Sequence, residues 1–247
     1  MLTVSHDQIA RMQDARRREY CQELVAHCRA RLPVVTAALR DAELARAVTD
    51  GVARAQRFGF ERRGGTRLVV ESSLLFGCGF ADDPLHPWAA PALATPHFVV
   101  ERRRARKLHD AMQGHIAGLL RGSSESPAEL VSTLRRFLAR DTFEIPTATW
   151  ATDLAALLET WFRRQTAAAP PGACLRLVRH IGGRASALSL KTPDDAAHCV
   201  ALQIGFGHRW YEDPALPWLQ RALAQGGMVA LRQAALSYLP EQGASPR

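Results

Sequence analysis

A chain of 247 residues with 47% hydrophobic and 23% charged residues is long enough for one large or two ordinary domains, and this composition excludes a disordered chain. Its five cysteines are odd in number and form no C-x-x-C, which argues against a disulfide framework and a zinc knuckle and predicts reduced thiols. The net charge of +8 comes almost entirely from arginine, because only Lys107 and Lys191 are lysines, so part of it can reflect a bias in coding composition.

Helix signals mark the first half of the chain. Ser5 to Gln8 have the form of a capping box, and apolar residues including Ile9 and Met12 then recur at three- and four-residue steps until Pro33. A second helix is predicted from Asp41 to Ala55, with Gly59 just beyond its end. Residues 67–76 fit a strand or a helix, and a long helix is predicted over 97–121.

The second half opens after a linker at 121–129, in which Ser126 is the predicted N-cap of a new helix and Pro127 its first residue. Further helices are predicted over 147–162, 173–181, 217–225 and 228–239, and residues 241–247 form a frayed tail. Because no alternating apolar pattern or hairpin signal occurs, we expect an all-α protein of about ten helices.

One phrase occurs twice, 130 residues apart: FGCGFADDPLHPW at 76–88 and FGHRWYEDPALPW at 206–218. This repeat predicts two similar helical units packed together, at residues 1–122 and 123–247. Because the second copy follows Thr192-Pro193, a helix start, the repeat also favours helix over strand at 67–76. The matched positions are Phe76, Gly77, Asp83, Pro84, Pro87 and Trp88 in the first copy, and Phe206, Gly207, Asp213, Pro214, Pro217 and Trp218 in the second.

The phrase has the composition of a structural corner. A glycine at 77 or 207 can adopt positive φ where a helix ends, and the aromatic residue at 80 or 210 is expected to fold back on the core. Asp83 and Asp213 are predicted N-caps, followed by a short turn and a helix that restarts at Pro87 or Pro217. The acidic pairs Asp82-Asp83 and Glu212-Asp213 could alternatively serve proton transfer or metal binding, which capping makes unnecessary.

Other polar groups also have a structural and a chemical interpretation. Asp194, Asp195, His198 and Cys199 could form a metal site, although a capping Asp beside a surface His is the simpler explanation. His86 could pair with Asp83, and His208 with Asp213, as His–Asp dyads. These dyads are not common to both copies, because Leu216 replaces His86 and Cys78 replaces His208. No metal or cofactor is therefore expected.

The run ERRRARK at 101–107 is the strongest charge cluster. It lacks interleaved aromatic residues, so nucleic acid is a less favoured ligand than an acidic protein surface. The candidate binding residues are Arg102, Arg103, Arg104, Arg106 and Lys107. On the same predicted helix, Gly114, Gly118 and Gly122 form a small-residue ladder that predicts close helix packing.

VARAQRFGF at 52–60, an apolar helix and then LLFGCGFADDPLHPWA at 74–89 resemble a family of small bacterial proteins encoded in type VI secretion gene clusters. The likeness covers about residues 5–95 and, more loosely, 148–222. A tandem of two units and the RRGG at 62–65 depart from the family pattern. The resemblance implies an accessory role in loading or chaperoning an effector, and it carries over no catalytic residues.

We therefore expect a non-enzymatic accessory protein that binds a secretion effector or its adaptor. Alternatives are an immunity protein that blocks an effector, and a toxin or hydrolase that uses the acidic corners. The start of the chain has no apolar core of a signal peptide, and no segment has the roughly 18 apolar residues of a membrane span. A cytoplasmic protein without membrane contact is expected.

Overall fold

Helices account for all the regular secondary structure in the described residues, which are 5–94, 100–121, 127–167 and 169–239 of this computed structural model. This confirms the all-α prediction. The elements are α1 (His6–Arg31), α2 (Pro33–Thr36), α3 (Asp41–Arg57), α4 (Arg63–Phe76), α5 (Ala89–Leu93), α6 (Glu101–Arg121), α7 (Pro127–Ala139), α8 (Trp150–Trp161), α9 (Arg163–Ala167), α10 (Ala173–Gly182), α11 (Pro193–Phe206), a 3-10 helix η1 (Trp210–Glu212) and α12 (Pro217–Tyr238).

Two of the predicted helix starts have the expected capping interactions. Ser5 and Gln8 form the expected capping box, in which the Ser5 hydroxyl accepts from the Gln8 N–H at 3.2 Å. Thr192 and Asp195 form another ahead of α11. The ambiguous 67–76 segment is helical, within α4. Of the linker predicted at 121–129, Arg121 ends α6 and residues 127–129 begin α7, with Pro127 first as predicted. Residues 122–126, which include Ser126, and the predicted tail at 241–247 lie outside the described residues.

The helix predicted over 97–121 is present as α6 from Glu101 onward, and residues 97–99 are not described. The predicted break near the C-terminus is also present. α12 continues past it, but Gly226 and Gly227 have non-helical dihedrals, and the φ of Gly227 is 61°.

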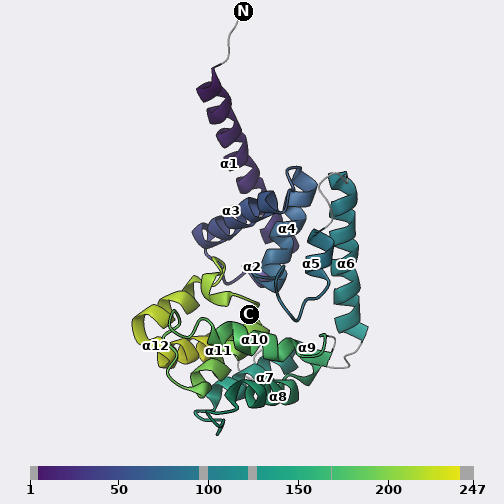
Figure 1. Cartoon of the computed structure of the whole chain (residues 1–247). Coiled ribbons are helices and arrows are strands. Elements are labelled where there is room, and N and C mark those ends of the chain that lie inside the picture. The colour runs from purple at the N-terminus through teal and green to yellow at the C-terminus, as the bar shows by residue number, and fades with distance from the viewer. Residues whose placement is uncertain (1–4, 95–99, 122–126, 168, 240–247) are drawn as a thin grey trace, which may run out of the picture.

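The first half of the chain packs as a layer of helices around two apolar clusters. α3 lies against both α1 and α4, while α6 lies against α4 and α5 (Figure 1). Leu24, Leu44 and Val70 belong to the cluster between α1, α3 and α4. Phe60 and Leu108 belong to the second cluster, which links α6 to α4 and α5.

The second half has one larger core. α10 packs against α8 and α11, and α7 packs against α11 and α12 (Figure 1). Phe137, Leu177 and Trp210 are fully buried there, and the Trp210 indole N–H donates to the Cys199 carbonyl at 3.2 Å. A fully buried Trp with a paired N–H contributes both apolar burial and a fixed orientation.

Each half contributes a residue to the core of the other. Leu85, from the first corner, is buried in the core formed by α7 to α12. Ala215 stands 130 positions later, and it packs against the first-half cluster that contains Leu44 and Val70. The division into units at 1–122 and 123–247 stays a prediction, but the two halves are not independently packed.

Arg104 departs from the expectation of an exposed basic surface on α6. It is 2% exposed, and its guanidinium donates to the main-chain carbonyls of Phe58 and Gly59 and lies 4.8 Å from the Phe60 ring centroid. Arg104 therefore ties α6 to the end of α3. Its neighbours in the run, Arg102, Arg103, Arg106 and Lys107, are exposed.

The glycine ladder on α6 does not mediate close packing at its described positions. A Cβ placed at Gly114 or Gly118 would meet no atom within 4 Å, and Gly122 is not described. The small-residue prediction was therefore wrong for Gly114 and Gly118. Among the described residues, no helix is both long and apolar enough to cross a membrane.

Candidate functional site

The two repeated phrases meet at their glycines. α4 ends at Gly77 with φ 86° and ψ 160°, and α11, also 14 residues long, ends at Gly207 with φ 97° and ψ 158°. A Cβ on Gly77 would lie 2.9 Å from the Gly207 Cα, and a Cβ on Gly207 would lie 2.5 Å from the Phe76 oxygen. Positive φ and this separation both require glycine, so the main chains of the two corners are in direct contact.

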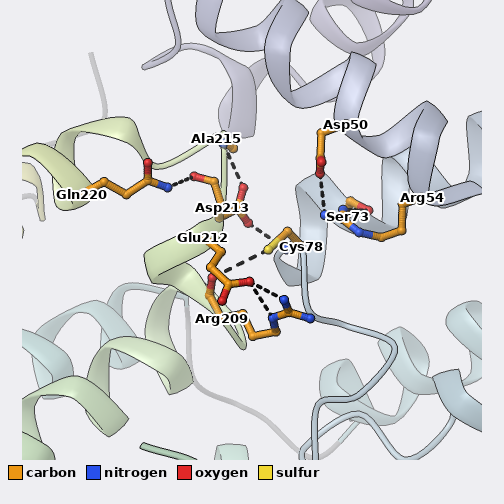
Figure 2. Close-up of polar contacts among 9 residues, drawn as sticks. All are labelled: Asp50, Arg54, Ser73, Cys78, Arg209, Glu212, Asp213, Ala215 and Gln220. Carbon is orange, nitrogen blue, oxygen red and sulfur yellow. Dashed lines mark hydrogen bonds and ion pairs between the residues drawn. The ribbon is translucent and has the colours of Figure 1, made fainter. Parts of the chain in front are cut away.

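Asp213 fastens the first corner to the second. Its carboxylate accepts from the Cys78 N–H at 2.7 Å and from the Ala215 N–H at 2.8 Å (Figure 2). The Asp213 carbonyl accepts from the Gln220 side chain at 2.8 Å, which ties the corner to α12. Cys78 and Asp213 are 135 residues apart, so this hydrogen bond joins the two halves.

Asp83 closes the corresponding turn in the first corner. Its carboxylate accepts from the Leu85 N–H at 2.8 Å, and the main-chain N–H of His208 in the other corner favours its charged form. His208 is the position that aligns with Cys78, and Leu85 aligns with Ala215. A main-chain hydrogen bond also joins the two corners, from the Gly79 N–H to the His208 carbonyl at 3.2 Å.

These contacts correct the predicted role of the two aspartates. Neither caps a helix. Each closes a turn onto the N–H two residues later, and the Asp213 carboxylate also accepts from Cys78 in the other corner. Pro84 and Pro214 follow in these turns. The restart at Pro217 is confirmed as the first residue of α12, whereas Pro87 stays in the turn and α5 begins at Ala89.

The aromatic residues of the phrases fold inward as predicted. Phe80 and Trp210 are fully buried. Phe76 and Trp88 meet edge to face with centroids 5.3 Å apart, and Phe206 and Trp218 do so at 5.6 Å. The tryptophans therefore anchor corresponding corners.

Burial changes the titration of the acidic corners. Loss of solvent raises the pKa of Asp83 to about 6, although two main-chain hydrogen bonds oppose that change, and it also raises the pKa of Asp213. Both carboxylates serve as acceptors for main-chain N–H groups. The arrangement makes them structural groups that hold the junction rather than an exposed acid pair.

The histidine beside Asp83 forms a different pair from the one predicted. His86 Nε2 is 3.7 Å from the Asp83 carboxylate, beyond hydrogen-bond range, whereas its Nδ1 lies 3.2 Å from His115 Nε2 on α6. Burial, and then the neighbouring His115, lower the pKa of His86 to about 4. The Asp213 carboxylate accepts from main-chain N–H groups, and among the described residues His208 Nδ1 has no hydrogen-bond partner, so the predicted His208–Asp213 dyad is not formed.

A cavity of about 420 Å³ lies at this junction, with walls from both corners. This volume is within the usual range for small-ligand sites. Polar groups on its wall include His86, His115 and Gln203. Gln203 is buried, and within the described residues its side-chain nitrogen has no hydrogen-bond partner. This cavity could not be predicted from the sequence, because its walls come from segments far apart in the chain.

The cluster at the start of α11 is structural. Asp195 belongs to the capping box, and Asp194 accepts from the Phe143 N–H at 2.9 Å. His198 was expected at the surface, but it is buried and bonds the Arg140 carbonyl at 2.9 Å. Cys199 is buried too, and the described part of the chain contains no group of three or more potential metal ligands.

The first half of α1 is the most exposed helical segment. All residues from 11 to 19 are exposed, and Figure 1 shows α1 projecting from the body of the protein. Its first anchoring contact is at Tyr20, whose hydroxyl donates to the Arg63 carbonyl at 2.5 Å. Ile9 and Met12, predicted to face a core, are instead 42% and 55% exposed.

The glycine contact makes a clear prediction. Gly77→Ala and Gly207→Ala should each lower the free energy of unfolding by about 3 kcal/mol or more, because each Cβ meets main-chain atoms at a positive φ. Chemical denaturation measures this effect. Gly114→Ala is the matched control, since it adds a methyl group to an exposed helix interior and should stabilise by up to about 1 kcal/mol. Equal effects at Gly77 and Gly114 would contradict the glycine contact.

The His86 environment predicts a pH dependence. In the unfolded chain this histidine takes up a proton near pH 6.5, but in the folded protein only near pH 4. The unfolded state therefore binds the proton first, and the free energy of unfolding decreases as the pH falls from about 6.5 towards about 4. His86→Gln should reduce the loss of unfolding free energy between about pH 7 and pH 4.5 by on the order of 2 kcal/mol.

Comparing His86→Gln with the wild-type protein separates the contribution of His86 from that of Asp83, because both proteins contain Asp83. Asp83 changes the pH dependence of stability in the opposite sense. Its raised pKa means that the folded protein binds a proton first as the pH falls. His109→Gln, at an exposed position of α6, is the control and should leave the pH dependence unchanged. If His86→Gln keeps the full wild-type pH dependence, the buried neutral His86 is ruled out.

No protein-family model matches this chain, and no curated protein or solved structure is detectably similar to it.

Proposed function

We propose that the protein is a non-enzymatic accessory protein that binds a type VI secretion effector, or the adaptor of that effector, through protein–protein contacts. The observation that carries the proposal is the exposed first half of α1. The family resemblance of the repeated phrases supplies the biological setting.

An exposed helix of this kind is unusual without a partner. Residues 6–19 of α1 extend over about 20 Å at 1.5 Å per residue. A helical segment of about 14 residues is only marginally stable in water on its own. Here it is continuous with the anchored half of α1 and is capped at Ser5. Ile9 and Met12 lie three residues apart, so they share one helix face, which suits docking in a groove of another protein.

Charge on the protein fits a partner with acidic groups. Arg16, Arg17 and Arg18 are exposed on α1, and Arg102, Arg103, Arg106 and Lys107 are exposed on α6. Such surfaces steer association with acidic proteins.

The rival proposal of a hydrolase that uses the corners has less support. Asp213 accepts two main-chain hydrogen bonds through its carboxylate and Asp83 accepts one, which is a structural use of both carboxylates. We also propose that the chain consists of two related units, since the two corners have corresponding geometry. We propose the cytoplasm as the compartment, since all five cysteines are free.

Co-expression with the products of the neighbouring genes tests the proposal. The tagged wild-type chain should co-purify with one of them. The double variant Ile9→Glu/Met12→Glu should reduce recovery of that protein at least tenfold, because it places two charges on the docking face. Val229→Glu is the control, since Val229 is 65% exposed on α12, remote in sequence from α1, and recovery should be unchanged.

The contrary outcomes have separate meanings. If none of the neighbouring products co-purifies with the wild-type chain, the accessory function is wrong. If the double variant recovers the partner as well as the wild-type chain does, the α1 surface is wrong. Growth rescue from one specific toxin on expression of this chain would instead select an immunity function.

A further inference from the structure

A second cavity, of about 350 Å³, lies where the two corners meet α10. Arg176, His180 and Arg184 contribute from α10 and the turn after it, at intervals of four residues, which places them along one side of that segment. Its full lining is Asp82, Pro84, Arg176, His180, Arg184, His208 and Arg209.

The lining is strongly basic. It contains three guanidinium groups and one carboxylate, that of the exposed Asp82. Two of the guanidinium groups are held near one another by Glu212. Its carboxylate accepts from Arg209 Nε at 3.0 Å and lies 3.8 Å from Arg184 (Figure 2 shows the Arg209 contact). The cavity therefore presents arginine side chains that are already positioned.

His208 supplies an independent observation. It is 3% exposed, and in the described part of the chain its Nδ1 has no hydrogen-bond partner. A buried polar atom left unpaired costs about 1–3 kcal/mol, which suggests that a ligand group completes it. The His208 ring packs on His180 with centroids 4.4 Å apart, and His180 is itself oriented by a 2.7 Å hydrogen bond to the Tyr211 hydroxyl.

The backbone at Arg209 is also unusual. Its φ is 62°, a left-handed conformation that residues other than glycine seldom adopt. Such strain commonly marks positions where a side chain must be directed to a site. Here it directs the residue that lies beside the buried His208.

We infer that this cavity binds the phosphate group of a small ligand, held by Arg176, Arg184 and Arg209 with His208 Nδ1 completing the contacts. Planar guanidinium groups bind phosphate oxygens through paired N–H donors. Three such groups exceed what the two oxygens of a carboxylate can engage, so phosphate is favoured over a simple carboxylate. This binding activity is separate from the proposed docking of α1, which uses other residues.

Titration calorimetry with inorganic phosphate at constant ionic strength tests the inference. The wild-type protein should bind phosphate saturably, and at least tenfold more tightly than acetate. Arg176→Ala and Arg184→Ala should each weaken phosphate binding at least fivefold, since each removes a charge-assisted contact. Arg176 is exposed, so its substitution should leave the fold intact.

Arg179→Ala is the matched control, because Arg179 is exposed on the same helix but is not part of the cavity lining. Its substitution removes the same charge and should leave phosphate affinity unchanged. A second measurement follows the histidine ring nitrogens by NMR, where phosphate should shift His208 Nδ1 and leave the exposed His109 unmoved. Absence of saturable binding, equal weakening by Arg179→Ala, or an unmoved His208 signal would overturn the inference.

Discussion

The close approach of Gly77 and Gly207 is the contact on which the rest of the structure depends. The two main chains touch where α4 and α11 end, and a methyl group on either glycine would collide with the other corner. At this contact the Asp213 carboxylate accepts from the Cys78 N–H, and the His208 carbonyl accepts from the Gly79 N–H. A buried carboxylate destabilises the folded state unless it is well hydrogen-bonded. The bond from Cys78 helps to satisfy the buried Asp213 carboxylate and also joins the two corners.

The same junction explains why the halves do not pack separately. Leu85 and Ala215 follow the two aspartates, and each is carried into the core of the opposite half. Both cavities described above have walls from these corners, so the junction also fixes their shapes. α1 has the opposite character, because its first half projects away from this rigid centre (Figure 1). Close packing at the centre and exposure at α1 are consistent with the proposed docking of α1 on a partner.

Local features of the fold could be predicted because they depend on neighbouring residues. The capping boxes at Ser5 and Thr192, the positive φ at Gly77 and Gly207, and the inward Phe80 and Trp210 each follow from a few adjacent residue types. The role of Asp213 could not be predicted in full, because one of the two main-chain N–H groups that its carboxylate binds, that of Cys78, lies 135 positions away.

The burial of Arg104 could have been predicted from the sequence. Arg104 lies four residues before Leu108 and eight before Met112, both buried, so the helical period places it on the inner face of α6. Its place in a run of basic residues suggested solvent exposure instead. Ile9 and Met12 show the reverse case, because their apolar spacing predicted burial in a helix that has no neighbour at that end in the described chain.

Native-state hydrogen exchange of the Cys78 and Gly79 amides tests the junction most directly. The Cys78 N–H bonds the buried Asp213 carboxylate and the Gly79 N–H bonds the His208 carbonyl, and both bonds cross the contact between the halves. Both amides should therefore exchange only through global unfolding, with equal protection matching the free energy of unfolding. Rapid exchange of either amide in otherwise well-protected protein would show that the corners open independently, and the account of the junction would then be wrong.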